Sequence, residues 1–414
     1  MPQYFTPGVY VEEVPSAIKP IAGVGTSTAG FIGAVANDVQ MPLIPGRTGL
    51  KAGGKTAEPA DFYPLAPAGV PQLVDGWERF KTLFGDGVKP GNRTLAQAVY
   101  GFFNNGGGRC WVTRLEPGSG DGKQGAKGPA DLLPADETVT GALDAFAVID
   151  EIALVAVPGA TSDAVQSALL DHCENEYLRD RFAILDGRRT ATPITAEIRG
   201  GVRDSSYGAI YYPWIDVGAK DAAGGTLYVP PSGHIAGVYA RVDAERGVHK
   251  APANEVIRGA LGVETPVGKQ AQAGLNPDDI NVIRRFDANV TIWGARTLAG
   301  ADHSEWRYIS SRRLFNYLRE SIDQGTQWVV FEPNAPELWS KIRRNVSAFL
   351  TTVWASGALL GATPEQAFYV VCDETTNPRE VRDLGQVVTE VGVALVKPAE
   401  FVVFRLSQWD GAAR

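Results

Sequence analysis

The segment Gly49–Thr56 has the G-x4-G-K-[ST] spacing of a phosphate-binding loop. In such a loop, backbone N–H groups and the N-terminus of the next helix hold the phosphates, so a buried strand must precede it and a helix must follow. Pro42 and Pro45 lie just before the motif and Pro59 lies just after it, which disrupts both elements. The sequence therefore favours a glycine-rich loop here, with nucleotide binding as the alternative.

Other side chains capable of chemistry are scattered. The four histidines lie far apart, at positions 172, 234, 249 and 303, without a zinc-protease motif or a C-x2-C pair. Ser16 and Lys19 fit S-x-x-K, but the partner motifs of that pattern are missing. The glycines of Asn104–Arg109 follow a predicted helix, as in a C-terminal turn. We predict no enzyme activity and no catalytic, metal-binding or cofactor-binding residues.

The composition of the 414 residues is that of a globular chain, with nine Trp and sixteen Phe available for a core. The formal net charge of −8 argues against general nucleic-acid binding, because few phosphates would be neutralised. The first residues resemble no secretory signal, and no long apolar run predicts insertion into a membrane. Three widely separated cysteines, at 110, 173 and 372, suit a reducing compartment.

Strands and helices alternate through the middle of the chain, which predicts a mixed α/β sheet. Two segments rich in proline and glycine, 41–75 and 116–135, are expected to be surface loops. Helices are predicted at 77–84, 94–103 and 162–178, and strands at 110–115, 152–157, 182–185, 209–214 and 290–293.

The last third contains two predicted helices, one from about Ser304 to Asp323 with basic arginines at 312, 313 and 319. The other begins with Asn334 and Glu337 in a capping-box spacing. Its apolar stripe is Leu338, Ile342, Val346, Phe349 and Val353. Lys341 and Arg344 project away from this stripe, and Arg343 lies on its flank. These three residues form either a solvated helix face or a basic stripe that meets an acidic partner.

Both ends of the chain carry strand patterns that need the edge of a sheet, in the same subunit or in a neighbour. The N-terminal pattern includes Gly8, Val9, Tyr10, Val11, Glu12 and Val14. The C-terminal pattern is Phe401, Val402, Val403, Phe404, Arg405 and Leu406.

Several stretches, taken in order along the chain, resemble the sheath proteins of contractile tails and injection systems. Each motif is short, but their order spans nearly the whole sequence. The similarity is greatest to sheaths of extracellular injection particles and R-type tailocins. The motifs are Tyr4–Glu13, Phe102–Gly107, Ile210–Trp214, Val229–Ala240, Arg246–Asn254, Val290–Leu298, Trp306–Leu314, Phe331–Asn334 and Lys397–Phe401.

The resemblance implies an α+β (mixed α/β) architecture. An inner sheath domain would combine an N-terminal arm, residues 1–25, with residues 281–414, including a C-terminal arm at 400–412. An outer α/β domain, residues 26–280, would be inserted between them. The charge distribution is compatible, because residues 281–414 hold 15 basic and 15 acidic side chains and the remaining residues carry the whole −8.

The resemblance also implies the function and the partners. Such subunits form hexameric rings that stack into a helical sheath around an inner tube protein, and the sheath contracts to drive the tube through a target envelope. Arms at the two chain ends would join subunits, and Lys341, Arg343 and Arg344 would face the tube. Baseplate and terminator or cap proteins are further expected partners. Assembly is expected in the bacterial cytoplasm, for a phage tail or a released particle. Another self-assembling virion component is the alternative.

Overall fold

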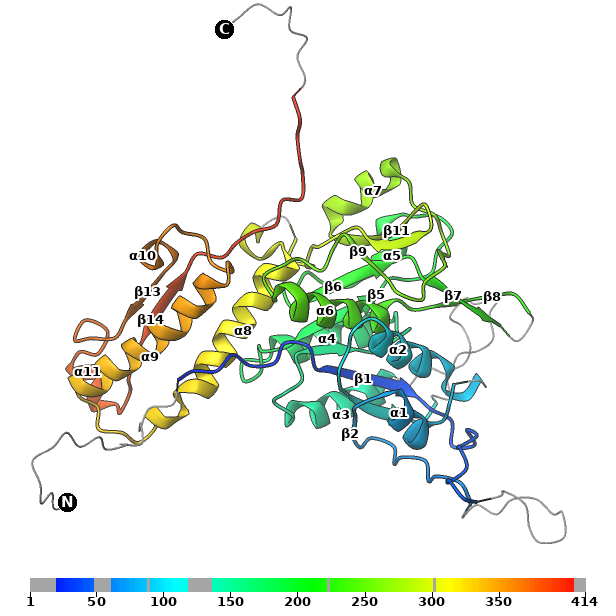
Figure 1. The fold of residues 1–414 in the computed structure, drawn as a ribbon, viewed down its shortest axis with the longest axis horizontal. Coiled ribbons are helices and arrows are strands. Elements are labelled where there is room, and N and C mark those ends of the chain that lie inside the picture. The colour runs from blue at the N-terminus through cyan, green and yellow to red at the C-terminus, as the bar shows by residue number, and fades with distance from the viewer. Residues whose placement is uncertain are drawn as a thin grey trace, which may run out of the picture. The chain divides into compact units, whose positions relative to one another are not determined.

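The computed structural model describes residues 20–47, 61–87, 90–117, 136–221, 224–300 and 303–405, which form two compact units (Figure 1). The large unit holds described residues 24–319 and 395–405, and the small unit holds 20–23 and 320–394. One passage between the units lies inside helix α8 (Ile309–Thr326). Residue 280, the expected domain boundary, is the first residue of strand β11 (Ile280–Phe286) in the large unit.

A nine-stranded mixed sheet lies at the centre of the large unit. Its middle strands, from β3 to β11, are all parallel, and antiparallel strands flank them on both sides. The predicted α/β alternation and each of the five predicted strands are confirmed. The order is β2 (Gln72–Val74), β3 (Cys110–Leu115), β1 (Ala29–Ala34), β4 (Leu154–Ala156), β5 (Phe182–Asp186), β6 (Gly208–Tyr212), β11, β12 (Asn289–Ile292) and β9 (Glu255–Val256).

Helices cover both faces of this sheet, because successive side chains of a buried strand point to opposite sides. In β1, Phe31 belongs to one apolar core and its neighbour Ile32 to the other. The first core is closed by α1 (Trp77–Phe84), α2 (Arg93–Asn104) and α6 (Ser232–Arg246). The second is closed by α3 (Asp136–Ala147), α4 (Asp163–Glu174), α5 (Thr195–Arg199) and α7 (Lys269–Leu275).

Two glycines let helices α2 and α6 pack with their backbones close together. A Cβ atom on Gly233 would lie 2.4 Å from Cα of Ala98, and one on Gly237 would lie 2.4 Å from the carbonyl oxygen of Phe102. No side chain fits in either place without moving a helix. The Gly-His-Ile-Ala-Gly stretch therefore fixes how α6 lies on α2.

The small unit contains one long helix and a two-stranded sheet. Helix α9 packs against β13, and β13 pairs antiparallel with β14. The predicted apolar stripe is buried along α9, which confirms the helical spacing. The elements are α9 (Pro336–Ala355), α10 (Pro364–Ala367), β13 (Phe368–Val371), α11 (Arg379–Asp383) and β14 (Glu390–Val393).

The remaining elements lie in the large unit or precede α9. An antiparallel three-stranded sheet runs in the order β10-β7-β8. Its strands are β7 (Ile215–Lys220), β8 (Thr226–Val229) and β10 (Gly262–Val263). Short 3-10 turns occupy Pro90–Asn92, Asn276–Asp278, Ser304–Trp306 and Gln327–Val329.

Four local predictions were wrong, and in the first two a longer-range contact decides the local structure. Helix α8 starts at Ile309 rather than Ser304, since Tyr308 forms a β-bridge with Arg296. Asn334 does not cap α9: its side chain accepts a hydrogen bond from the Trp339 indole and donates one to the Gln386 carbonyl. Helix α4 ends at Glu174, and the predicted loop 41–75 ends in strand β2.

Two of the three arginines noted in the sequence of helix α8, Arg312 and Arg313, are buried. The Arg313 guanidinium makes two bonds to the Asp243 carboxylate, of 2.9 and 2.6 Å, and both side chains are at most 5% exposed. Thr26 supplies a carbonyl to Arg313 and a hydroxyl proton to Asp243. Arg312 lies over the ring of Trp306, 3.6 Å from its centroid. Both charges therefore join α8 to the large unit instead of facing a partner.

We expect Asp243→Asn to destabilise the large unit by about 3–5 kcal/mol, because it leaves the Arg313 charge buried without a counter-ion. The double variant Asp243→Leu with Arg313→Met should recover most of the loss. Denaturant unfolding of the soluble protein measures both. The exposed pair Arg379–Asp383 is the control, and Asp383→Asn should change stability by less than about 1 kcal/mol. A loss no larger for Asp243→Asn than for the control would contradict the assignment.

Candidate functional site

The C-terminal segment emerges from the large unit as an exposed apolar chain. Phe401, Val402, Val403 and Phe404 are 73, 69, 77 and 84% exposed, and residues 401–405 pair with no strand in the described part of this chain. A run of four large apolar side chains in water is unfavourable and marks a contact surface. The predicted strand is therefore not formed within the subunit as far as Arg405, while Leu406 and the N-terminal residues Gly8–Val14 lie outside the described residues.

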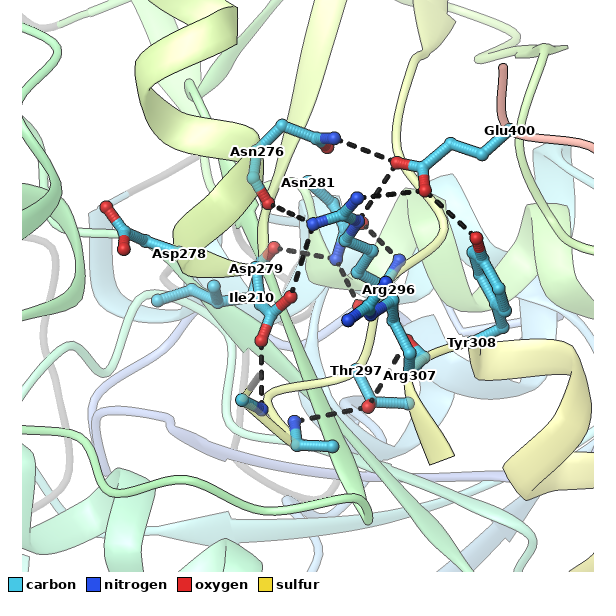
Figure 2. A network of polar contacts seen from close by, with 12 residues as sticks. Ile210, Asn276, Asp278, Asp279, Asn281, Arg296, Thr297, Arg307, Tyr308 and Glu400 are labelled. Atoms are coloured by element: carbon cyan, nitrogen blue, oxygen red, sulfur yellow. Dashed lines mark hydrogen bonds and ion pairs between the residues drawn. The ribbon is translucent and has the colours of Figure 1, made fainter. Parts of the chain in front are cut away.

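The residue before this exposed run, Glu400, is held by three side chains (Figure 2). Its Oε1 accepts hydrogen bonds from Arg296 Nε at 2.9 Å and from Asn276 Nδ2 at 2.8 Å. Its Oε2 accepts from Arg296 Nη2 at 2.9 Å and from the Tyr308 hydroxyl at 3.1 Å. Arginine thus engages the carboxylate with two parallel bonds, the strongest geometry for this pair. We call this set of contacts the Glu400 clamp.

Arg296 is itself fixed by the centre of the sheet. Asn281 of β11 accepts a hydrogen bond from the Arg296 backbone N–H and donates one to the Arg296 carbonyl, at 2.8 and 2.7 Å. The same Asn281 amide also reaches the Ile210 carbonyl of β6, at 3.2 Å. Arg296 Nη1 bonds the Asn276 carbonyl at 2.8 Å and lies 3.8 Å from the Asp279 carboxylate. The clamp therefore rests on two neighbouring parallel strands.

Electrostatics in the clamp favour an ionised Glu400. Partial burial raises the pKa of Glu400, but hydrogen bonds from Arg296 and Asn276 and the positive charge of Arg296 lower it by more, so it lies below the ordinary value. The neighbouring Tyr308 has its pKa raised by burial and by the Glu400 charge, so it stays a hydrogen-bond donor. At neutral pH the carboxylate and its donors are therefore all in the bonded state.

The small unit offers a sheet with open edges. In the described residues, β13 and β14 pair only with each other. On one face of the pair, the Tyr369 ring lies over Gly392, and a Cβ atom on Gly392 would come within 2.1 Å of this ring. The Tyr369 hydroxyl donates a hydrogen bond to the Glu390 carboxylate on the other strand. Unpaired N–H and C=O groups along the outer sides of both strands are a template for further strands.

The predicted basic residues lie on the exposed side of α9, and the structure separates them into two kinds. Arg343 donates a hydrogen bond to the Cys372 carbonyl at 3.1 Å, so it belongs partly to the fold of the small unit. Lys341 and Arg344 are exposed and have no side-chain partner among the described residues. Residues 320–394 hold five basic and ten acidic side chains, so these two cations stand out on an acidic unit.

The usual ligand position of a parallel sheet is filled by the chain itself. Asp186, at the end of β5, accepts hydrogen bonds from the Gly159 N–H at 2.9 Å and from the Ser232 N–H and hydroxyl at 2.8 Å each. Ser232 begins α6, so this carboxylate lies where the N-terminus of a helix would bind an anion. Full burial raises the pKa of Asp186 to about 6 in spite of these bonds.

The other chemical candidates do not come together in the described residues. His172 and His234 are largely buried, and burial lowers the pKa of each to about 4. No set of three His, Cys, Asp or Glu side chains in the described ranges is arranged to hold a metal ion. Within the same ranges, no helix has the length and apolarity needed to span a membrane. Gly49–Thr56, Ser16 and Lys19 lie outside them.

The middle and the C-terminal parts of the chain match known protein families. Residues 135–298 match the family model of the phage tail sheath protein central domain, and residues 301–408 match that of the phage tail sheath C-terminal domain. The chain is also similar to a subunit in the cryo-electron microscopy structure of the anti-feeding prophage helical sheath in the contracted state. The two are 30% identical over 98% of this chain and 99% of the other, with a TM-score of 0.73. The chain belongs to the tail sheath protein family.

Two further relatives agree with this assignment. A subunit of the contracted PVC sheath complex, from an extracellular contractile injection system, is 27% identical over 99% of both chains, with a TM-score of 0.73. A prophage major tail sheath protein of Pseudomonas aeruginosa (strain UCBPP-PA14) is 26% identical, but the match spans only 62% of this chain and 65% of that protein. The chain is thus a subunit of the contractile-sheath class, as its sequence motifs indicated.

The Glu400 clamp was not predicted from the sequence. Arg296 and Glu400 are 104 residues apart, and no local pattern connects them. Both nevertheless lie within stretches that resemble sheath proteins, Val290–Leu298 and Lys397–Phe401. The one sequence feature that could have indicated the clamp is the acidic residue Glu400 directly before an apolar strand pattern. A carboxylate at this position can fix the start of the strand if a cation lies nearby.

The clamp predicts a pH dependence of stability. A carboxylate whose pKa is lowered by folding stabilises the folded state above its ordinary pKa of about 4.5, and this contribution is lost as the pH falls through the lower folded pKa. We therefore expect the stability difference between wild type and Glu400→Gln to be constant from pH 7 to pH 5 and to narrow below pH 4.5. Denaturant unfolding across this range measures it; a difference that widens on acidification would contradict the clamp.

Proposed function

We propose that the sheath subunits polymerise by exchanging strands. The C-terminal arm, Phe401–Leu406, would pair with an open edge of β13–β14 in a neighbouring subunit, and the N-terminal arm around Gly8–Val14 would pair with another edge. Main-chain hydrogen bonds give such contacts their affinity without requiring a particular surface. The observation that carries this proposal is the coexistence, in one chain, of a two-stranded sheet with open edges and an exposed apolar arm.

Exchange of this kind has consequences for the assembly. A subunit that gives an arm to a neighbour and accepts one elsewhere makes a head-to-tail contact, which propagates instead of closing on a dimer. We propose that six-subunit rings stack in this way around an inner tube, between a baseplate and a terminal cap. Contraction would then be a rearrangement of subunits that stay joined by their arms. Relatives in contracted helical sheaths and a baseplate structure support this picture.

We further propose that the inner domain of the sheath consists of the N-terminal arm, residues 1–25, and residues 281–414, and that residues 26–280 form the outer domain. Subunits would assemble in the bacterial cytoplasm before the particle is released or packaged. Membership in a family of phage tail and extracellular injection components supports this location in a bacterial particle.

Removal of residues 401–414 should abolish polymers and leave a folded, soluble monomer, because only the donor strand is lost. Negative-stain microscopy and sedimentation measure assembly, and circular dichroism with thermal unfolding tests the fold. Removal of residues 1–14 should have the same effect. Deletion of residues 221–224, which connect β7 to β8, is the control and should leave polymers intact. Long, regular sheaths from the 401–414 deletion would refute strand exchange.

We propose that Lys341 and Arg344 contact the inner tube. Both are exposed on α9 and lack partners among the described residues, and they stand on a unit with an excess of carboxylates. Contacts of this type contribute about 0–1 kcal/mol each when solvent-exposed. Many such weak contacts along a tube hold a sheath in place yet release it during contraction. Arg343 would contribute less, because its guanidinium already serves the Cys372 carbonyl.

The double variant Lys341→Glu and Arg344→Glu should polymerise into empty sheaths as wild type does, but should assemble poorly on purified tubes. Charge reversal removes the attraction to an acidic tube and replaces it with repulsion. Arg379→Glu, an exposed cation of the same unit on α11, is the matched control and should assemble normally on tubes. Electron microscopy of tube-containing assemblies gives the measurement. Equal tube occupancy for the α9 double variant and the control would refute a basic stripe facing the tube.

We propose that this subunit works mechanically, without nucleotide hydrolysis. The N-terminus of α6, which is the natural anion site of the parallel sheet, is occupied by the Asp186 carboxylate. The glycine-rich Gly49–Thr56 motif is flanked by prolines, which suits a surface loop better than a phosphate site. The energy for contraction would therefore be stored in the assembled lattice itself.

A further inference from the structure

We propose that the Glu400 clamp is the positioning element of the C-terminal arm. By fixing Glu400 to the sheet of its own subunit, the clamp sets where the free strand begins, and hence which residues of the arm meet which residues of the acceptor. Arg296, Asn276 and Tyr308 are then positioning residues that act through Glu400. This inference rests on the strand exchange proposed above and adds the control of register to it.

The change in environment at Glu400 is abrupt. The Glu400 side chain is 20% exposed and has four hydrogen bonds, whereas the next residue, Phe401, is 73% exposed and has no polar contact in the described residues. The arm therefore has a defined root at a single residue.

The root is also rigid. The chain of contacts runs from the Glu400 carboxylate to Arg296 and from the Arg296 backbone to Asn281, which bonds to the neighbouring strand β6 (Figure 2). Arg296 is only 8% exposed and Asn281 only 1% exposed, so neither side chain is free to reorient. The Asn281 side chain holds the Arg296 backbone through two buried hydrogen bonds, so the arm starts from a fixed point relative to the sheet.

The arm needs such a fixed point because its own sequence barely specifies a register. In a strand, successive side chains point to opposite faces, so Phe401 and Val403 share one face and Val402 and Phe404 the other. Over these four residues both faces are apolar and similar in size. A slip of one residue would exchange the two faces, and among Phe401–Leu406 only Arg405 would carry a charge from one side of the strand to the other, so slippage is weakly opposed. A clamped root supplies the register that the side chains do not.

The proposal can be tested by cross-linking in assembled polymers. The three native cysteines are buried, so a single cysteine introduced into the arm, at Val402 or at Val403, reacts without competition from the surface. The acceptor cysteine replaces Tyr369 on β13 or Glu390 on β14, two exposed residues on one face of the pair. A disulfide needs Cβ atoms about 4 Å apart, so for a given register only one of the two arm positions can form it.

In the wild-type background we expect disulfide between subunits from one arm position only, at least several-fold above the other. In Glu400→Ala the yields at the two positions should become about equal, and layer lines in images of the polymers should weaken. Monomer unfolding and circular dichroism check that the variant is folded, and Glu400→Gln provides a second variant of the same shape. Lys397→Ala, an exposed change in the same segment, is the control and should keep the wild-type pattern.

The outcomes separate the two proposals. If Glu400→Ala keeps one-sided cross-linking and sharp layer lines, the clamp does not set the register and this inference is overturned, although strand exchange survives. If regular wild-type polymers give no cross-link at either acceptor position, β13–β14 is not the acceptor and the proposed exchange fails. In that case the layer lines of Glu400→Ala still decide whether the clamp orders the lattice.

Discussion

The two-stranded sheet β13–β14 has open edges in the described residues, and the proposed assembly depends on this constraint. Two strands alone are marginally stable in water, and each outer edge presents backbone N–H and C=O groups that another chain can satisfy. Packing against α9 supports this sheet from one side but leaves its edges unpaired in the described residues. The exposed apolar arm beyond Glu400 has the opposite deficiency, since it has strand-forming residues and no sheet. In the proposed strand exchange, a second copy of the chain would satisfy both.

The zero net charge of residues 281–414 is the sum of two parts with opposite net charge. Residues 281–414 are neutral by sequence, but residues 320–394 hold five basic and ten acidic side chains, and the rest of the region holds the reverse. Several of those remaining arginines are internal: Arg313 is paired with Asp243, Arg312 lies on aromatic rings, and Arg296 holds Glu400. Cationic residues in this region therefore mostly serve the fold, which leaves Lys341 and Arg344 as the distinct cations of the small unit.

Periodic features were predictable from sequence because each is decided locally. The buried parallel strands and the stripe of α9 follow from hydrophobic spacing, and the family followed from the order of short motifs. Features decided by distant residues were not predictable: Asn334 bonds Trp339 and Gln386 in place of capping, Tyr308 delays α8 by pairing with Arg296, and Arg313 turns inward to Asp243. The Glu400 clamp belongs to this second group, so the sequence indicated a strand-forming segment at 401–406 but not the residues that hold its start.

The architecture of the large unit suits a scaffold that must not deform. Its parallel sheet is the kind that often carries a ligand at the carboxyl ends of the strands, yet Asp186 binds its own helix there and leaves no anion to be exchanged. Helices α2 and α6 are locked together by glycines that tolerate no larger residue. With a body held rigid in these two places, the exposed segment beyond Glu400 is the part that the proposed exchange would place on a neighbour. An arm that begins at one clamped residue can then stay paired with a neighbour while the bodies of the two subunits change position, which is the mechanical requirement of a sheath that shortens without coming apart.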